Sequence, residues 1–139
     1  MQKSLIDSGP LIALFDRDDR YHVPVMSFLK EYHGHLLTSW PVITEVSHLL
    51  DFHARAQIDF LKWVSLGGLH MIQLDHRDLD RLIVLMEKYS DIPMDLADGS
   101  LIVISESLNI RNIITIDSDY YIYRTNRKRA LKNLLQGYL

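Results

Sequence analysis

The sequence predicts an α/β fold, a three-layer α/β/α sandwich around a mostly parallel sheet of four or five strands. Short apolar runs alternate with longer segments in which apolar residues recur every three or four positions. This alternation of strand and helix is typical of parallel sheets with helices on both faces. The 139 residues show no repeat, linker or low-complexity segment, so we expect one domain over residues 1–139.

The chain opens with a strand at about residues 2–7, where a short apolar run indicates a buried element. A helix is expected to begin directly after it, because Ser8 can cap a helix and Pro10 suits a first helical turn. A second helix is expected at about residues 23–32. Gly34 then ends that helix.

A short strand at residues 35–38 precedes a third helix, which opens at Ser39-Trp40-Pro41. The apolar residues of this helix keep the spacing of one buried face. A further amphipathic helix is expected at about residues 56–66 and stops at Gly67-Gly68. The first half of the chain therefore contributes two strands, each followed by two helices.

The second half continues the alternation. A strand is expected at about residues 69–74, and Asp75 can cap the helix that runs from there to about residue 88. Pro93 precedes a helix at about residues 96–108. A strand at residues 112–116 then ends at Asp117.

The C-terminal segment is less sharply patterned. Residues 120–124 are a candidate last strand, and residues 131–135 fit a strand or a helix equally. A basic cluster lies here, formed by Arg124, Arg127, Lys128, Arg129 and Lys132. Such a cluster fits a solvated tail as well as a contact with RNA.

Six acids fall where strands are expected to end or helices to begin. They are Asp7, Glu45, Asp95, Asp98, Asp117 and Asp119. Because ligand sites in open α/β sheets gather at the carboxyl ends of the strands, the fold can bring these acids to one rim. An acidic metal site is therefore the leading hypothesis.

Each acid also has a purely structural interpretation. Asp7 could cap the following helix, although Ser8 offers the same role, and Glu45 lies at the margin of its helix's buried face, where a glutamate is usually solvated. Asp95 and Asp98 have the spacing of a capping box, yet Asp98 projects between apolar residues, where an unpaired carboxylate is costly. Asp117 and Asp119 fit an Asx turn.

Electrostatics favour a cation for the group as a whole. Two carboxylates about 4 Å apart repel by roughly 4 kcal/mol at an effective dielectric constant of about 20, so four together would oppose folding unless neutralised. With no cysteine and no zinc-like histidine spacing, an all-oxygen site suits Mg²⁺ or Mn²⁺. Such ions polarise a phosphoryl oxygen, generate a metal-bound hydroxide and stabilise the leaving oxygen, and phosphodiester hydrolysis needs all three effects.

The overall charge permits a nucleic-acid substrate despite the formal net charge of -3. Without the six acids, 12 of the 18 acidic residues remain beside 15 basic ones, so a cation at the rim would leave a basic balance elsewhere. The N-terminal residues reach an acid too early for a signal-peptide core, and no apolar run approaches membrane-spanning length. We expect a soluble cytoplasmic protein.

Four segments of the chain together resemble a known family, the PIN-domain ribonucleases, and within it the small single-domain toxins of the VapC type. The order and spacing of the segments carry the resemblance, which covers nearly the whole chain. The segments are Leu5-Ile6-Asp7-Ser8-Gly9-Pro10-Leu11-Ile12-Ala13-Leu14-Phe15-Asp16, Leu37-Thr38-Ser39 with Ile43-Thr44-Glu45-Val46, Met94-Asp95-Leu96-Ala97-Asp98-Gly99-Ser100-Leu101, and Ile114-Thr115-Ile116-Asp117-Ser118-Asp119-Tyr120.

The resemblance implies a metal-dependent endoribonuclease with a PIN-like fold. The positions that match the family's catalytic and metal-binding acids are Asp7, Glu45, Asp98 and Asp117, and the auxiliary positions are Asp95, Asp119, Ser8 and Thr115. It also implies an RNA substrate, homodimerisation and, for a toxin, an antitoxin protein as partner. PIN domains also act in RNA processing and decay, and the family pattern does not separate these roles.

Two alternatives stay open from the sequence. A receiver-like signalling domain also gathers acids and Mg²⁺ at strand ends, although Asp117-Ser118-Asp119 stands where such domains keep a lysine. A catalytically silent PIN-like module that binds RNA or protein is the second, and the four retained acids count against it. One departure from the family pattern is Gly99, where an alanine is more usual and where a glycine weakens the start of a helix.

Overall fold

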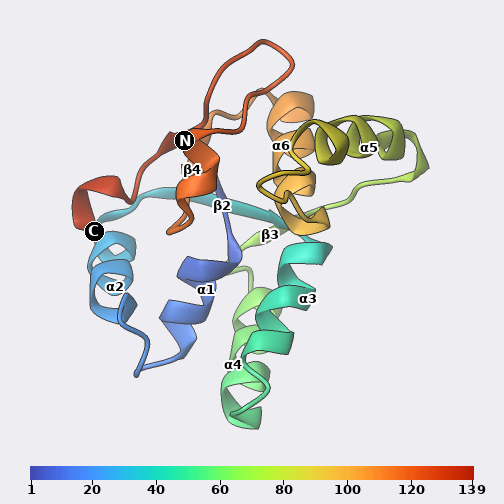
Figure 1. The fold of residues 1–139 in the computed structure, drawn as a ribbon. Coiled ribbons are helices and arrows are strands. Elements are labelled where there is room, and N and C mark those ends of the chain that lie inside the picture. The colour runs from blue at the N-terminus through green and yellow to red at the C-terminus, as the bar shows by residue number, and fades with distance from the viewer.

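The computed structural model describes residues 1–139, whose centre is a five-stranded sheet (Figure 1). The strands lie in the order β3-β2-β1-β4-β5, and every neighbouring pair is parallel. Their bounds are β1 Gln2–Ile6, β2 Gly34–Ser39, β3 His70–Ile72, β4 Asn112–Ile114 and β5 Lys132–Asn133. Since all strands run the same way, their carboxyl ends share one edge of the sheet.

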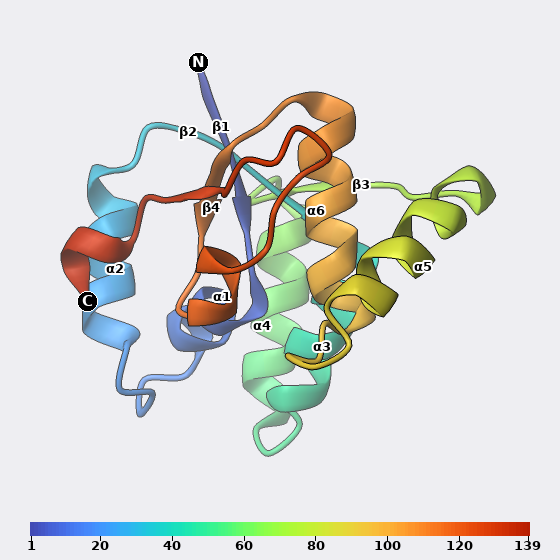
Figure 2. The same ribbon diagram turned by 45° about the horizontal axis from the view of Figure 1, so that its top comes forward.

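Six α-helices cover the sheet. They are α1 Ser8–Phe15, α2 His22–Glu31, α3 Trp40–Leu49, α4 Ala54–Ser65, α5 Leu79–Lys88 and α6 Leu96–Leu108. The connections from β1 to β3, which contain α1 to α4, move in one direction across the sheet, whereas the connection through α5 and α6 returns past two strands to β4. Because crossovers between parallel strands are right-handed, helices α1 to α4 cover one face of the sheet and helices α5 and α6 cover the other (Figure 2). The predicted three-layer α/β/α sandwich is confirmed.

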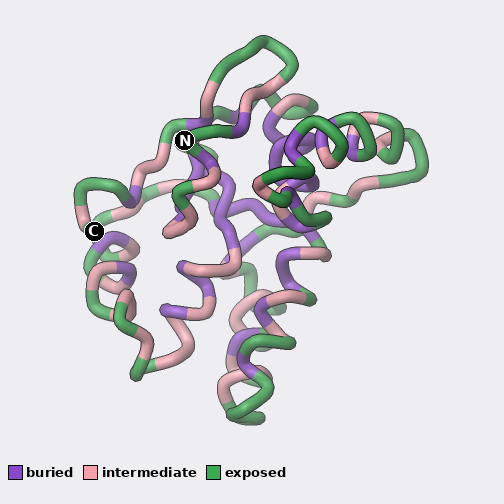
Figure 3. The backbone as a smooth tube through the Cα atoms, in the orientation of Figure 1, coloured by how far each residue is buried: buried purple, intermediate pink, exposed green.

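The hydrophobic core is centred on strands β1 and β4, whose backbone is drawn as buried in Figure 3. Leu5 and Ile6 of β1 and Ile113 and Ile114 of β4 are fully buried, as central strands of parallel sheets usually are. Residues 101–104 of α6 are buried as well. This core fixes the last residues of β1 and β4, and therefore the position of whatever follows them.

Most predicted elements are confirmed with shifts of one or two residues at their ends. The helix expected at residues 96–108 is α6 with the same bounds. Ser8, expected as a cap, is instead the first residue of α1, and Asp7 occupies the cap position without a side-chain cap hydrogen bond. Gly34, expected to end a helix, is the first residue of β2, because α2 already ends at Glu31.

The candidate strand at residues 120–124 is wrong. The chain forms a 3₁₀ helix, η2 (Ser118–Tyr121), because the Asp117 carboxylate accepts a hydrogen bond from the Asp119 N–H and closes the turn. The last strand is β5, within the segment 131–135 that the sequence leaves open.

The sheet order also decides between two fold classes. Flavodoxin-like receiver domains have the strand order 2-1-3-4-5, whereas this sheet has β3-β2-β1-β4-β5. The receiver-like alternative is therefore wrong. None of the helices combines the length and the apolar composition needed to cross a membrane.

Candidate active site

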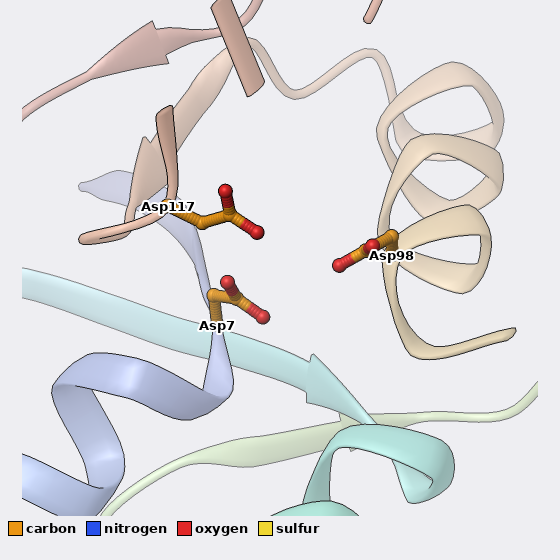
Figure 4. Close-up of side chains that lie close together, drawn as sticks. All are labelled: Asp7, Asp98 and Asp117. Atoms are coloured by element: carbon orange, nitrogen blue, oxygen red, sulfur yellow. The ribbon is translucent and has the colours of Figure 1, made fainter. Parts of the chain in front are cut away.

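Three carboxylates from distant parts of the chain meet at the carboxyl edge of the sheet. Asp7 follows β1, Asp98 lies in the first turn of α6 and Asp117 follows β4. One oxygen from each lies within 4.8 Å of the other two, and the three side chains point toward one another (Figure 4). The two central strands and the start of α6 thus build a cluster from residues 110 positions apart in the chain.

Asp7 is the buried member of the cluster, with 4% of its surface exposed. Its Oδ2 accepts a hydrogen bond from the Thr115 hydroxyl at 3.1 Å, whereas Oδ1 is the one buried side-chain oxygen of the protein without a hydrogen-bond partner. Burial, with a smaller contribution from the charges of Glu45 and Asp117, raises the pKa of Asp7 to about 7. Asp7 therefore lacks a positive partner in a place where it strongly needs one.

Asp117 is positioned by the loop that follows β4. Its backbone N–H donates to the Thr115 hydroxyl at 3.0 Å, so Thr115 connects Asp117 to Asp7. Its Oδ1 accepts from the N–H of Asp119 at 2.9 Å, as expected of an Asx turn. Burial, followed by repulsion from Asp117, raises the pKa of Asp119.

Asp98 combines the two roles that the sequence suggests for it. Its N–H donates to Oδ1 of Asp95 at 2.8 Å, and its own Oδ2 accepts from the Asp95 N–H at 3.5 Å, so the expected capping box is present. The same side chain points into the acidic cluster. Burial, with smaller contributions from the charges of Asp7 and Asp95, raises the pKa of Asp98 to about 7.

Two tyrosine hydroxyls meet the Asp98 carboxylate, and sequence reasoning missed this contact. Tyr120 donates to Oδ1 at 3.3 Å and Tyr123 donates to Oδ2 at 3.2 Å. Both rings are almost completely buried. The two tyrosines follow the last acids and are three residues apart. In a 3₁₀ turn this spacing places two side chains on the same side, but the sequence pattern favours a strand here.

Glu45 lies on α3 beside the cluster but is not one of the three acids within 4.8 Å. It is half-buried, and its charge acts on Asp7. The start of α3 is tied to α6 through a buried hydrogen bond of 2.7 Å between the hydroxyls of Ser39 and Ser100. Glu45 is therefore at the border of the cluster, on a helix whose position is fixed relative to α6.

The remaining candidate residues lie outside the cluster. Asp95 is exposed at the start of α6, and Ser8, half-buried, begins α1 next to Asp7. Arg127, Lys128 and Arg129 are exposed in the loop before β5, and Arg127 and Arg129 lie near the C-terminal end of α6, about 15 Å along that helix from Asp98. Lys132 is exposed on β5, and Arg124 is half-buried, with its guanidinium donating to the carbonyls of Tyr121 and Tyr123.

The donor set of the cluster fits a hard divalent cation. All three groups offer carboxylate oxygens, the ligands that Mg²⁺ and Mn²⁺ prefer. The unpartnered Oδ1 of Asp7 fits the same interpretation, because a buried carboxylate oxygen without a partner is costly. A cation between Asp7, Asp98 and Asp117 would satisfy it and offset the mutual repulsion.

Comparison with known proteins finds similarity to VapC proteins. No family model matches the sequence. The chain is 22% identical over 119 residues to the ribonuclease VapC26 of Mycobacterium tuberculosis, and the match covers 84% of this chain and 88% of the relative. The crystal structure of VapC20 of Mycobacterium tuberculosis, a toxin that cleaves the sarcin-ricin loop, superposes with a TM-score of 0.76 at 15% identity, over 85% of this chain and 92% of VapC20.

The fold and the acidic edge define an α/β protein with the PIN-domain architecture. The sequence match to one VapC protein and the structural match to another confirm the resemblance to VapC-type PIN-domain proteins.

Proposed function

We propose that this protein is a metal-dependent endoribonuclease of the VapC type that hydrolyses phosphodiester bonds of RNA. One observation carries the proposal: the oxygens of Asp7, Asp98 and Asp117 lie within 4.8 Å of one another, and one buried oxygen of Asp7 has no partner. The ribonuclease VapC26, to which the sequence is similar over most of its length, supports RNA as the substrate.

Asp7, Asp98 and Asp117 would hold the cation, Mg²⁺ or Mn²⁺, with Glu45 at the border of the same site. When bound, such an ion polarises a phosphoryl oxygen and supplies positive charge where the transition state gains negative charge. Two further residues position these carboxylates. Thr115 holds the Asp7 carboxylate, and Asp119 keeps the loop that carries Asp117 closed.

We assign to Glu45 the role of orienting the water that attacks the phosphorus. It is half-buried and close enough to influence Asp7, so it can accept a hydrogen bond or a proton from a water in the cluster. As the new phosphorus–oxygen bond forms, the bond to the leaving ribose oxygen breaks. Asp95 and Ser8 lie at the rim and would serve as auxiliary groups.

The sarcin-ricin loop is the first RNA to test, because VapC20 cleaves it and has the same fold. The exposed Arg127, Lys128 and Arg129, together with Arg124 and Lys132, are assigned to RNA backbone contacts outside the cluster. Phosphate contacts of this kind weaken with salt, so their removal should lower both the affinity for RNA and its salt dependence.

A homodimer and an antitoxin are the protein partners we propose. Leu79 and Ile83 lie one helical turn apart on α5, with 45% and 52% of their surfaces exposed, and an exposed apolar pair of this kind supports a protein contact. The molar mass of the purified protein, alone and with a co-expressed antitoxin, tests both partners. The cytoplasmic location remains a prediction.

The function is tested by incubating the purified protein with a mixed pool of tRNA and sarcin-ricin loop RNA in Mn²⁺ or Mg²⁺, beside an EDTA control. The Asp98→Asn variant, purified in parallel, is the matched control for a contaminating nuclease. Metal-dependent cleavage that the variant loses supports the proposal. Equal cleavage by both proteins contradicts the assigned site, and metal binding without cleavage of any RNA favours the catalytically silent RNA- or protein-binding module.

A further inference from the structure

The contacts around Asp98 assign a role to two buried tyrosines. We propose that Tyr120 and Tyr123 are positioning residues, whose hydroxyls hold the Asp98 carboxylate toward Asp7 and Asp117 so that the three acids can share one cation. This inference rests on the proposed function, since it concerns the same metal site. It assigns the role to hydroxyl groups rather than to the aromatic rings.

The two hydroxyls meet opposite ends of one carboxylate. Tyr120 donates to Oδ1 at 3.3 Å and Tyr123 donates to Oδ2 at 3.2 Å. A carboxylate oxygen has two lone pairs, so Oδ1 of Asp98 keeps one for a metal ion, whereas Oδ2 already accepts from both Tyr123 and the Asp95 N–H. With a donor at each end, the plane of the carboxylate is fixed even though each hydrogen bond is longer than the usual 2.7–2.8 Å.

The local backbone explains why these two tyrosines act together. Tyr120 lies in η2, and the turn continues because the N–H groups of Ile122 and Tyr123 both donate to the carbonyl of Asp119. Residues three apart in a 3₁₀ turn lie one above the other, so Tyr120 and Tyr123 share a side. Tyr121 lies between them in sequence, is 44% exposed and has its hydroxyl near Asn133 instead.

Packing holds the rings in place. The rings of Tyr120 and Tyr123 meet edge to face with centroids 5.2 Å apart, and the ring of Tyr89 also packs edge to face against Tyr123, at 5.1 Å. The Tyr89 hydroxyl accepts a hydrogen bond from the Arg124 N–H at 2.9 Å. Because side-chain packing restrains both rings, the two hydroxyls are already aimed at Asp98 before any ligand binds.

A purely structural explanation of the pair is less complete. Phenylalanine would fill the same space without the cost of burying a hydroxyl, and no partner other than Asp98 is found for either hydroxyl. Asp98 also needs restraint, because it is only half-buried and lies beside the negative Asp7 and Asp117. Repulsion would turn it toward solvent, and the two donors oppose that motion.

The test compares Tyr120→Phe, Tyr123→Phe and the double variant with Tyr121→Phe, a matched control from the same turn. The main measurement is Mn²⁺ affinity by calorimetry, with kcat and KM for RNA cleavage and the melting temperature measured on the same samples. Each single variant should bind Mn²⁺ several-fold more weakly, and the double variant about 10- to 100-fold more weakly. In RNA cleavage kcat should fall while KM for RNA stays constant, and Tyr121→Phe should match wild type.

Unchanged Mn²⁺ affinity in the folded single variants, with wild-type binding intact, would overturn the role of the tyrosines and leave the proposed function standing. If the wild-type protein itself binds no Mn²⁺ and cuts no RNA, both proposals fail. The Asp98→Asn background gives a second comparison that does not depend on the double variant's folding. In the Asp98→Asn protein, adding Tyr123→Phe should cause no further loss of Mn²⁺ affinity. A loss as large as the one that Tyr123→Phe causes in the wild-type protein would contradict action through Asp98.

Discussion

Replacing Asp7 with asparagine should stabilise the metal-free protein at pH 8, although it removes a ligand of the proposed metal site. The reason is the charge that Asp7 must carry in a buried place. Burial raises its pKa in the folded protein to about 7, whereas the ordinary value is 3.8. The contribution of Asp7 to stability is therefore complete below about pH 4 and is lost as the pH rises to about 7.

The magnitude follows from the same two values. A pKa of about 7 in the folded protein, against 3.8 in the unfolded chain, corresponds to about 4 kcal/mol of folding free energy lost at pH 8. At pH 5 the loss is less than half as large, because the folded carboxyl group is still protonated. Asparagine keeps the shape but must bury an amide, so we expect a net gain of about 2 kcal/mol at pH 8.

Urea denaturation in EDTA at pH 5 and pH 8 measures this effect. Asp51→Asn, which changes an exposed acid in the turn after α3, is the control for a general loss of negative charge. Asp7→Asn should gain stability relative to wild type between pH 5 and pH 8, and Asp51→Asn should not. An Asp7→Asn protein that is destabilised equally at both pH values would refute the reasoning.

Three further changes test the structure around the site and the fold that supports it. Thr115→Val removes the hydroxyl that donates to Asp7 and should weaken Mn²⁺ binding about tenfold, and calorimetry that shows wild-type affinity would contradict this role. Arg81→Met removes two of the three hydrogen bonds of the nearly buried Glu106, at 2.8 and 2.9 Å, and leaves only the one from the Asn126 N–H, so it should lower the free energy of unfolding by about 2 kcal/mol, and an unchanged urea midpoint would count against it. Gly34→Ala places a methyl group 2.5 Å from a backbone oxygen of β1 and should cost about 2 kcal/mol or more, whereas a wild-type melting temperature would show that the strands can separate without penalty.

The sequence predicts four of the five strands and the three acids that meet at the edge of the sheet. Asp7 and Asp117 follow short apolar runs that form β1 and β4, and the capping-box spacing of Asp95 and Asp98 places the start of α6 correctly. These features depend on local patterns: a buried strand, a polar residue at its end and a capped helix start. Their convergence then follows from the parallel arrangement of the strands.

Contacts between segments could not be predicted in the same way. The hydroxyls of Tyr120 and Tyr123 reach Asp98 only because residues after Asp117 form a 3₁₀ turn, and the apolar and aromatic residues there favoured a strand instead. The distance of Glu45 from the three central acids depends on how α3 packs against α6. That packing is set by tertiary contacts, such as the Ser39–Ser100 hydrogen bond, which leave no periodic trace in the sequence.

The location of a bound cation is the measurement that tests the metal site most directly. Crystals soaked in Mn²⁺ should show an anomalous scattering peak at about 2.2 Å from carboxylate oxygens of Asp7, Asp98 and Asp117, and the unpartnered Oδ1 of Asp7 should be among the ligands. A peak at another place on the surface, or no peak at a Mn²⁺ concentration that supports RNA cleavage, would contradict the assignment of these three acids.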